Sequence, residues 1–382
     1  MIPYGRQDID KADIDAVVDV LQSDFLTQGP AVPAFEAAIA AHCDVAHAVA
    51  VNSATSALHI AYLALGVAPG KIVWTVPNTF VATANAAHYC GADVGFVDID
   101  PSTYLMDLND LAKRLEAAEK SGRLPTVVSP VHFGGMSVDM RRLRELADQY
   151  GFAIVEDASH AIGAEYERRP VGCCLWSDIA VFSFHPVKII TTAEGGLATT
   201  RDAELAATMQ ELRTHGITRD PERMRGPSEG GWYYQQTKLG FNYRMTDMQA
   251  ALGLSQMKRL DQFIARRREL ANRYDQLLAG LPVGRPARLE SSESSWHLYV
   301  IQVPERRRVF DALREAGIGV NVHYIPVHLQ PFYRDLGFSP GDYPRAEAYY
   351  EQAISIPLYP GMSDADQDAV VAALGKALEA TS

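Results

Sequence analysis

Residues 126–157 read TVVSPVHFGGMSVDMRRLRELADQYGFAIVED, and this stretch decides the fold class. Two apolar runs rich in valine and isoleucine, 126–133 and 152–157, enclose a segment whose apolar residues recur at helical spacing. Neither run shows the strict apolar–polar alternation of a strand with one exposed face. Apolar runs of this kind are typical of parallel strands that helices cover on both faces. The stretch therefore predicts one strand–helix–strand unit of an α/β protein.

The same alternation of apolar runs and helical patterns extends to both sides of this unit. Further strands are predicted at 48–51, 71–76, 94–99, 178–184 and 197–200. Helical patterns follow the first three of these runs. The first half of the chain is therefore predicted to be one large α/β domain.

A different pattern begins after the polar, glycine-rich segment 225–236. One long helix is predicted from Thr246 to about Leu278, and apolar runs at 296–303 and 318–327 follow it. These segments indicate a smaller α+β domain. We predict a large domain over residues 1–250 and a small C-terminal domain over residues 251–382.

Composition narrows the class of protein. The 382 residues hold 35 Lys and Arg against 47 Asp and Glu, and the formal net charge of −12 argues against a nucleic acid partner. Four cysteines without metal-binding spacing favour reduced thiols, and no metal site is predicted. The first residues lack the apolar core of a signal peptide, and no run of 18 apolar residues occurs. We expect a cytoplasmic protein that does not enter a membrane.

Lys188 is the first candidate for chemistry. It lies in FSFHPVKIITTAEGG, residues 182–196, where the neighbouring residues are predicted to be buried. A buried lysine must be paired, or its pKa must fall, and a lowered pKa gives a nucleophilic amine. A lone lysine of this kind is also compatible with an ordinary loop residue whose charge reaches water.

Other candidates lie at the ends of predicted elements. Residues 52–56, NSATS, precede a predicted helix and suit either a phosphate site or a simple helix cap. Asp157 ends a predicted strand and His160 follows it, at the sheet edge where α/β proteins bind ligands. The DID at 98–100 is compatible with a glycosyltransferase motif, but a turn before Pro101 is favoured. His323 and His328 suit a substrate-binding loop better than a metal site, because Pro326 interrupts their spacing.

These pieces together have one chemical logic. A pyridoxal phosphate enzyme needs a phosphate anchor, a carboxylate for the pyridine nitrogen and a lysine amine. The segment 52–56, Asp157 and Lys188 supply one of each. The combination makes Lys188 a better candidate than it is alone.

Several motifs carry a resemblance to a known family. NSATSALH, PNTFVATAN, EDASHAIGA, FSFHPVKIITT and GFNYRMTD resemble the DegT/DnrJ/EryC1/StrS sugar aminotransferases, over nearly the whole chain. The resemblance implies the aspartate aminotransferase fold, fold type I, with a mostly parallel seven-stranded sheet. It implies pyridoxal 5′-phosphate, in its aldehyde and amine forms, as cofactor. Lys188 would hold the cofactor covalently and move protons, while Asp157 would pair with the pyridine nitrogen.

The resemblance also implies roles for further residues. Cofactor contacts would come from Ala54, Thr55, Phe80, His160, Ser183 and Asn242, with Asn242 reaching the phosphate of the other subunit. This role implies a homodimer with shared active sites. Substrate contacts are expected from Phe25, Thr27, His185, Tyr324 and His328. Arg219 and Arg244 are hypothesised to bind a carboxylate or diphosphate of the substrate.

Within the family, MIPYGRQDI, SDFLTQGPAVPAFE and GVNVHYIPVHLQPFY resemble the transaminases of pseudaminic acid biosynthesis. The implied reaction moves the amino group of L-glutamate to C4 of UDP-2-acetamido-2,6-dideoxy-β-L-arabino-hex-4-ulose. The product would be UDP-4-amino-4,6-dideoxy-N-acetyl-β-L-altrosamine. A transaminase for another nucleotide keto-sugar and a non-catalytic sensor of cofactor or sugar nucleotide remain alternatives. One departure is Ala193, which stands where the family has glycine.

Overall fold

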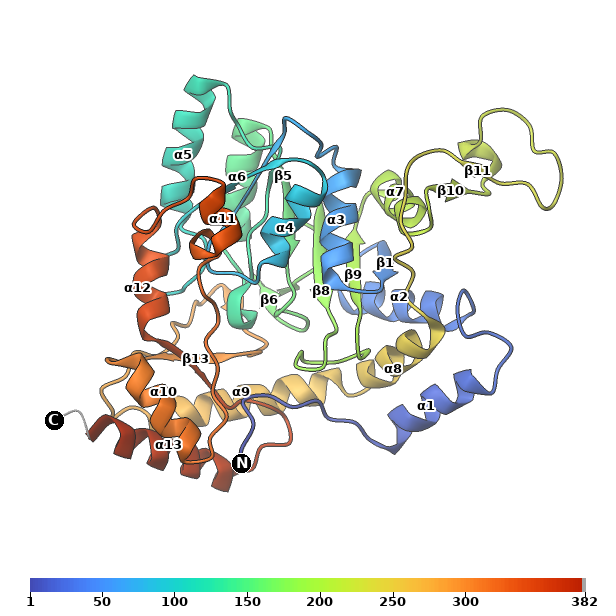
Figure 1. Cartoon of the computed structure of the whole chain (residues 1–382). Coiled ribbons are helices and arrows are strands. Elements are labelled where there is room, and N and C mark those ends of the chain that lie inside the picture. The colour runs from blue at the N-terminus through green and yellow to red at the C-terminus, as the bar shows by residue number, and fades with distance from the viewer. Residues whose placement is uncertain (380–382) are drawn as a thin grey trace.

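The computed structural model describes residues 1–379, and a seven-stranded sheet forms its centre (Figure 1). The strand order is β1-β9-β8-β5-β4-β2-β3, and only β9 runs antiparallel to its neighbours in this sheet. Its strands are β1 (His47–Val51), β2 (Ile72–Thr75), β3 (Asp93–Phe96), β4 (Val127–Val128), β5 (Ala153–Asp157), β8 (Ile179–Ser183) and β9 (Gly196–Thr200). Each predicted strand of the first half is thus present, and the prediction of a mostly parallel sheet is confirmed.

Helices cover both faces of the sheet. In β1, Val49 and Val51 face a core that α3 and α4 complete, whereas Ala48 and Ala50 face a second core with α2. This alternation explains why β1 is apolar at successive positions. The helices of this part are α1 (Lys11–Leu21), α2 (Ala31–His42), α3 (Ala54–Ala64), α4 (Ala82–Tyr89), α5 (Leu108–Ser121), α6 (Met140–Tyr150) and α7 (Ala203–Arg213).

The long helix predicted from Thr246 is two helices, α8 (Asp247–Met257) and α9 (Leu260–Leu277). The break falls at Arg259, whose φ of −111° and ψ of 3° are not helical. Its guanidinium binds Asp8 at 2.6 Å and the fully buried Asp13 at 2.5 Å. A buried carboxylate without a partner would be strongly destabilising, so these ion pairs explain the break.

The C-terminal part has its own apolar core beside the sheet. A two-stranded sheet of β13 (Tyr299–Gln302) and β14 (Ala353–Ile356) packs with α9 and two further helices, α10 and α13. The predicted run 318–327 forms isolated bridges to Ile2 and Ser355 instead of a strand. The remaining helices are α10 (Arg306–Glu315), α11 (Pro331–Asp335), α12 (Pro344–Gln352) and α13 (Asp364–Glu379).

Short strands outside the main sheet complete the structure. β10 (Ile217–Thr218) and β11 (Gln235–Gln236) form the base of an arm that projects from the molecule beside α7 (Figure 1). β12 (Ser292–Glu293), β6 (Glu165–Tyr166) and β7 (Arg169–Pro170) form a small antiparallel sheet. Within residues 1–379, no helix is both long and apolar enough to cross a bilayer.

Candidate active site

A cavity of about 840 Å³ lies where β5 and β8 end and α3 begins. Carboxyl ends of parallel strands are the usual ligand-binding edge of such sheets. The structure brings nine of the predicted site residues to its wall: Ala54, Thr55, Phe80, Asp157, His160, Ser183, His185, Lys188 and Tyr324.

Lys188 lies in the connection between β8 and β9. β8 ends at Ser183, and the backbone N–H of Lys188 donates to the carbonyl of His185 at 2.9 Å, which closes a turn. The turn removes Lys188 from the strand ladder and leaves its side chain on the cavity wall. Burial lowers the pKa of Lys188 to about 8, although the negative charge of Asp157 opposes the shift. A substantial fraction of this amine is therefore neutral near physiological pH.

Asp157 faces the same cavity with only 5% of its surface exposed. Its Oδ2 accepts a hydrogen bond from Thr83 Oγ1 at 2.6 Å, and its Oδ1 accepts one from the backbone N–H of Ser159 at 3.1 Å. The Thr83 hydroxyl in turn contacts that of Thr79 at 2.8 Å. These two hydrogen bonds fix the orientation of the Asp157 carboxyl group on the cavity wall.

The N-terminus of α3 forms another part of the wall. Ser53 caps the helix by accepting a hydrogen bond from the N–H of Ser56 at 3.1 Å. The first two helical N–H groups, of Ala54 and Thr55, have no acceptor within residues 1–379 and lie on the cavity. A Cβ at Gly196 would come within 2.3 Å of the Ala54 nitrogen, so glycine is needed for this close approach. Free N–H groups at a helix N-terminus suit a phosphate.

Aromatic side chains form a further part of the cavity wall. His160 Nε2 is 3.0 Å from the hydroxyl of Tyr324, and the two rings stack with an interplanar angle of 25°. Phe80 lies 6.2 Å from Tyr324 between ring centroids, and 59% of its surface is exposed. Phe80 can therefore cover a flat ring in the cavity without moving neighbouring core residues.

Three further residues lie on the wall. Tyr4, from the N-terminal segment, and Asn321, from the connection before α11, were missed by the sequence analysis. His323, from the same connection, belongs to the segment that was predicted to bind substrate. His323 Nδ1 contacts Ser355 Oγ at 2.7 Å, and burial lowers the pKa of His323 to about 3, with the charge of Lys188 adding to the shift. The motif MIPYGRQDI, which contains Tyr4, could have drawn attention to this residue. Nothing in the local sequence of the motif, however, indicates that Tyr4 lines a cavity.

Six predicted residues do not line this cavity: Phe25, Thr27, Arg219, Asn242, Arg244 and His328. Backbone bridges hold Thr27 beside Thr246 and Arg244 beside Val51. Arg219 lies at the base of the projecting arm, with its guanidinium 6.0 Å from the ring centroid of Tyr234. The protomer alone therefore does not assemble all of the residues that the resemblance implies.

The predicted sugar contact at His328 is corrected by its burial. Its side chain is completely buried, and its Nε2 binds Glu347 at 2.9 Å. Its ring also packs at 4.8 Å against Tyr343 between centroids. No surface of His328 is left for a sugar to contact in the protomer.

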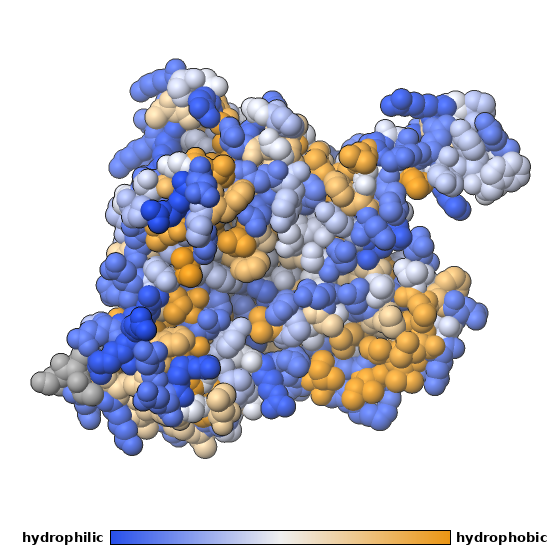
Figure 2. Space-filling view, viewed as in Figure 1, coloured by the Kyte–Doolittle hydropathy of each residue, from blue (hydrophilic) through white to orange (hydrophobic). Residues whose placement is uncertain are grey.

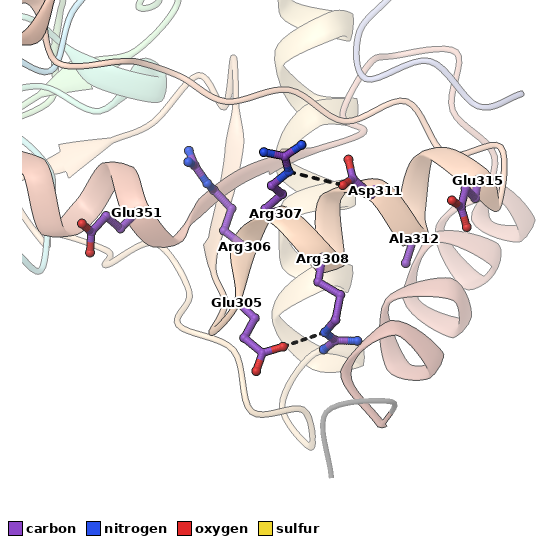
Figure 3. A pocket seen from close by; sticks show the side chains of 8 residues that line it. All are labelled: Glu305, Arg306, Arg307, Arg308, Asp311, Ala312, Glu315 and Glu351. Atoms are coloured by element: carbon purple, nitrogen blue, oxygen red, sulfur yellow. Dashed lines mark hydrogen bonds and ion pairs between the residues drawn. The ribbon is translucent and has the colours of Figure 1, made fainter.

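Two other features do not offer comparable chemistry. Asp98 accepts from the backbone N–H groups of Arg345 and Ala346, and Asp100 caps the turn at Ser102, so the DID has a structural role. A hollow of about 650 Å³ over α10 is lined by alternating charges, with Arg307 paired to Asp311 at 3.8 Å (Figure 3). Its charged side chains are those of a solvated helix surface.

Comparison with known proteins agrees with this geometry. The DegT/DnrJ/EryC1/StrS aminotransferase family model matches residues 7–375. The chain belongs to this family.

Relatives and solved structures are similar along their whole length. The chain is 41% identical to the spore coat polysaccharide biosynthesis protein SpsC of Bacillus subtilis, with 98% of this chain and 96% of SpsC covered. It is 40% identical to a UDP-4-amino-4,6-dideoxy-N-acetyl-β-L-altrosamine transaminase of Campylobacter jejuni, with 99% and 98% covered. PseC of Helicobacter pylori, an aminotransferase of pseudaminic acid biosynthesis, superposes with a TM-score of 0.91 at 30% identity, with 99% of both chains covered.

The prediction of a pyridoxal phosphate cofactor is confirmed by the family and by similar solved structures. Spr1654 of Streptococcus pneumoniae, described as a sugar aminotransferase in its PMP form, superposes with a TM-score of 0.91 at 32% identity and covers 100% of both chains. The chain is a pyridoxal phosphate-dependent sugar aminotransferase of fold type I. The residues on the cavity wall suit this cofactor, since they supply an amine of lowered pKa, a buried carboxylate and two free helical N–H groups.

Ala193 adopts the conformation that the sequence comparison suggested for a glycine. Its φ is 65°, in the left-handed region, and its N–H donates to Thr191 Oγ1 at 2.9 Å.

Ala193→Gly is expected to raise the free energy of unfolding by about 0.5–1 kcal/mol, because the left-handed strain exceeds the added freedom of the unfolded chain. Urea unfolding measures the change. The control Ala265→Gly, on the exposed face of α9, should lower stability by about 1 kcal/mol. Equal changes in the free energy of unfolding for the two substitutions would contradict backbone strain at Ala193.

The lowered pKa of Lys188 gives a second prediction. Attachment of pyridoxal 5′-phosphate to the cofactor-free protein should accelerate about tenfold per pH unit below the Lys188 pKa of about 8 and level off above it. Only the neutral amine can attack the aldehyde, which explains the direction. Asp157→Asn should move the midpoint to lower pH, because the lost carboxylate holds the Lys188 pKa up. Stopped-flow absorbance measures the rate, and a midpoint near the ordinary lysine value of 10.5 would contradict the account.

Proposed function

We propose that the enzyme moves the amino group of L-glutamate to C4 of UDP-2-acetamido-2,6-dideoxy-β-L-arabino-hex-4-ulose. The product is then UDP-4-amino-4,6-dideoxy-N-acetyl-β-L-altrosamine. The observation that carries aminotransfer is the half-buried Lys188 amine, which shares one cavity with Asp157 and the N-terminus of α3. Support for this sugar comes from the relative of that name at 40% identity.

Each of the main polar groups has one task in this proposal. Lys188 holds the cofactor through its amine and afterwards carries a proton to or from the reacting carbon. Asp157 would pair with the pyridine nitrogen, and its hydrogen bonds from Thr83 and Ser159 keep it oriented. The bound cofactor stores the amino group between the two substrates and stabilises negative charge at the carbon that loses a proton.

Other residues position the cofactor. The N–H groups of Ala54 and Thr55, with the hydroxyl of Ser183, would bind its phosphate, since all three residues line the cavity and Gly196, which pairs with Ser183, closely approaches the Ala54 nitrogen. Phe80 covers one face of its ring. His160 lies beside the ring oxygen. His185 and Tyr324 contact the sugar from the remaining wall.

We further propose a homodimer in which each active site receives residues from both subunits. The apolar face of α1 is exposed at Ile14, Val18 and Leu21, and this apolar patch is visible over the α1 and α8 region (Figure 2). The projecting arm exposes 74% of Trp232 and 79% of Leu239. Large exposed apolar groups of this kind favour association. Phe25, Thr27, Arg219, Asn242 and Arg244 then act at the site of the partner, which fits their positions outside the cavity of their own subunit.

Alternative substrates have specific support as well. SpsC, at 41% identity, is at least as similar to this chain as the altrosamine transaminase. A transaminase for another nucleotide keto-sugar is therefore the second candidate. A non-catalytic sensor is the third, and it would bind the cofactor without turnover. The domain division near residue 250 and a cytoplasmic location are also proposals.

Product analysis distinguishes these substrates. Purified enzyme is incubated with L-glutamate and either the 4-keto L-arabino or the D-xylo UDP-sugar, and mass spectrometry and proton coupling constants identify the product. We expect amination at C4 of the L-arabino sugar, at least about tenfold faster than of its epimer. Faster amination of the D-xylo sugar would support the second candidate. Absence of turnover, with intact cofactor binding, would support a sensor.

Subunit mixing tests the shared site. Lys188→Ala and Asn242→Ala are each expected to have little activity as pure homodimers. In a heterodimer, one site receives an intact Lys188 and an intact Asn242, so co-expression should restore about one quarter of wild-type activity. Mixtures without restored activity, although heterodimers are isolated through different affinity tags, would contradict sharing. Lys188→Ala mixed with Lys188→Met is the negative control.

A further inference from the structure

The ring of His160 is held by two hydrogen bonds whose directions depend on each other. The backbone N–H of Gly134 points at Nδ1 from 3.3 Å, and Nε2 lies 3.0 Å from the hydroxyl of Tyr324. A backbone N–H can only donate, so Nδ1 must accept with its lone pair. A neutral imidazole carries one proton, which is then on Nε2. The Nε2–H therefore donates to the Tyr324 oxygen.

A cationic His160 does not fit this arrangement. Protonation of Nδ1 would direct a second N–H at the N–H of Gly134 and lose that hydrogen bond. Burial keeps the pKa of His160 well below its usual value, and the positive charge of Lys188 adds to this effect. His297, whose ring centroid is 4.5 Å from that of His160, has a lowered pKa for the same main reason. The ring is therefore neutral, with a fixed proton position.

The direction of the Gly134 N–H is itself fixed. Gly134 has a φ of 65°, and its carbonyl accepts from the N–H of His297 at 2.9 Å. The next carbonyl, of Gly135, accepts from the N–H of Ser295 at 3.2 Å. The Ser295 hydroxyl donates to the carbonyl of His160 at 3.1 Å. The turn at 134–135, Ser295 and His160 therefore belong to one hydrogen-bonded network. The peptide plane of the Gly134 N–H also carries the Phe133 carbonyl, which accepts from the N–H of Met136 at 3.2 Å. Rotation of the N–H away from His160 would break that hydrogen bond as well.

The turn is also anchored beside Asp157. The backbone N–H of His132 donates to the carbonyl of Asp157 at 3.0 Å, and the side chain of His132 binds the buried Glu156 at 2.6 Å. His132 Nδ1 accepts from the N–H of Val138 at 3.2 Å. The same strand end thus positions the Asp157 carboxylate and the N–H that sets the His160 proton.

The proton on His160 Nε2 determines where the Tyr324 hydroxyl can direct its own hydrogen. Because its oxygen accepts from His160, its own hydrogen must be directed elsewhere. Within residues 1–379 this hydroxyl has no second partner, and Tyr324 lines the cavity. If His160 carried its proton on Nδ1, the Tyr324 hydroxyl would instead donate its hydrogen to Nε2. The hydroxyl would then present only lone pairs to the cavity. The N–H of Gly134 excludes that arrangement.

We propose that Tyr324 is a catalytic hydrogen-bond donor to a negatively polarised oxygen of the bound ligand, and that His160 is the positioning residue that directs its hydrogen there. The ligand oxygen is the ring oxygen of the cofactor or the keto oxygen of the sugar. Both gain from a donor on the cavity wall, because a preorganised hydrogen bond strengthens as charge develops on the oxygen. Only the identity of this ligand rests on the proposed function. The proton position on His160 does not.

The first test uses the cofactor-free protein and needs no activity. Nitrogen-15 NMR of histidine-labelled enzyme distinguishes the two neutral tautomers and the cation, and the spectrum of His160→Gln identifies the His160 signals. We expect the Nε2–H tautomer of His160 from about pH 6 to about pH 8. A proton on Nδ1, or a titration in this range, would overturn the proposal.

Variants test the consequence for the ligand. Tyr324→Phe should lower kcat/KM roughly 10- to 100-fold, the usual loss for a hydrogen bond to a charged oxygen. Tyr350→Phe on α12 is the control. Glutamine at position 160 can accept from Gly134 and donate to Tyr324, whereas leucine can do neither. His160→Gln should therefore retain at least about tenfold more activity than His160→Leu. Equal losses in the two variants would overturn the positioning role.

Spectroscopy separates the two sources of the oxygen. If the oxygen belongs to the cofactor, Tyr324→Phe shifts the pH midpoint of the visible absorption band of the holoenzyme. If it belongs to the sugar, the band and the half-reaction with L-glutamate stay unchanged, while the half-reaction with the keto-sugar slows. Either result supports the donor. An unchanged band and two unchanged half-reactions would overturn it. An enzyme that binds no cofactor would contradict the proposed function instead, and the NMR result would still decide the His160 proton.

Discussion

The balance between burial and charge at Lys188 is the constraint on which the site depends. Burial favours the neutral amine, whereas Asp157 favours the ammonium, and the resulting pKa of about 8 lies between a solvated lysine and a fully buried one. Closer pairing with a carboxylate would give an inert cation. Without any neighbouring charge, the amine would be neutral, but the cavity would lack a partner for a protonated pyridine ring. The fold has to keep both groups in one cavity at an intermediate separation.

The sheet achieves this separation through its topology. Asp157 ends β5 and Lys188 follows the neighbouring β8, so hydrogen-bonded strands fix the distance between their chain segments. The N-terminus of α3 approaches from the next part of the same edge, and Gly196 of β9 permits close contact there. Asp157 and the first N–H groups of α3 are therefore positioned by regular elements of the sheet layer. Other residues of the wall, such as Tyr4 and His323, come from irregular segments near the N-terminus and in the C-terminal part.

The central strands could be predicted, and so could the position of Asp157 and Lys188 at one edge of the sheet, because these signals are local. Buried parallel strands appear as apolar runs, Asp157 ends one such run, and Lys188 lies in the connection that follows another. The break at Arg259 could not be predicted, because it depends on Asp13, which is distant in sequence. For the same reason, the burial of His328 depends on its tertiary contact with Glu347. Tyr4 and Asn321 were missed because neither carries a local pattern that indicates a shared cavity.

The central claim is that Lys188 is the amine that holds the cofactor. The most direct measurement is borohydride reduction of the holoenzyme, followed by protease digestion and mass spectrometry of the labelled peptides. The account predicts one added phosphopyridoxyl group per chain, on the peptide that contains Lys188, and none after prior conversion to the amine form with L-glutamate. A label on another lysine, with Lys188 unmodified, would contradict the account.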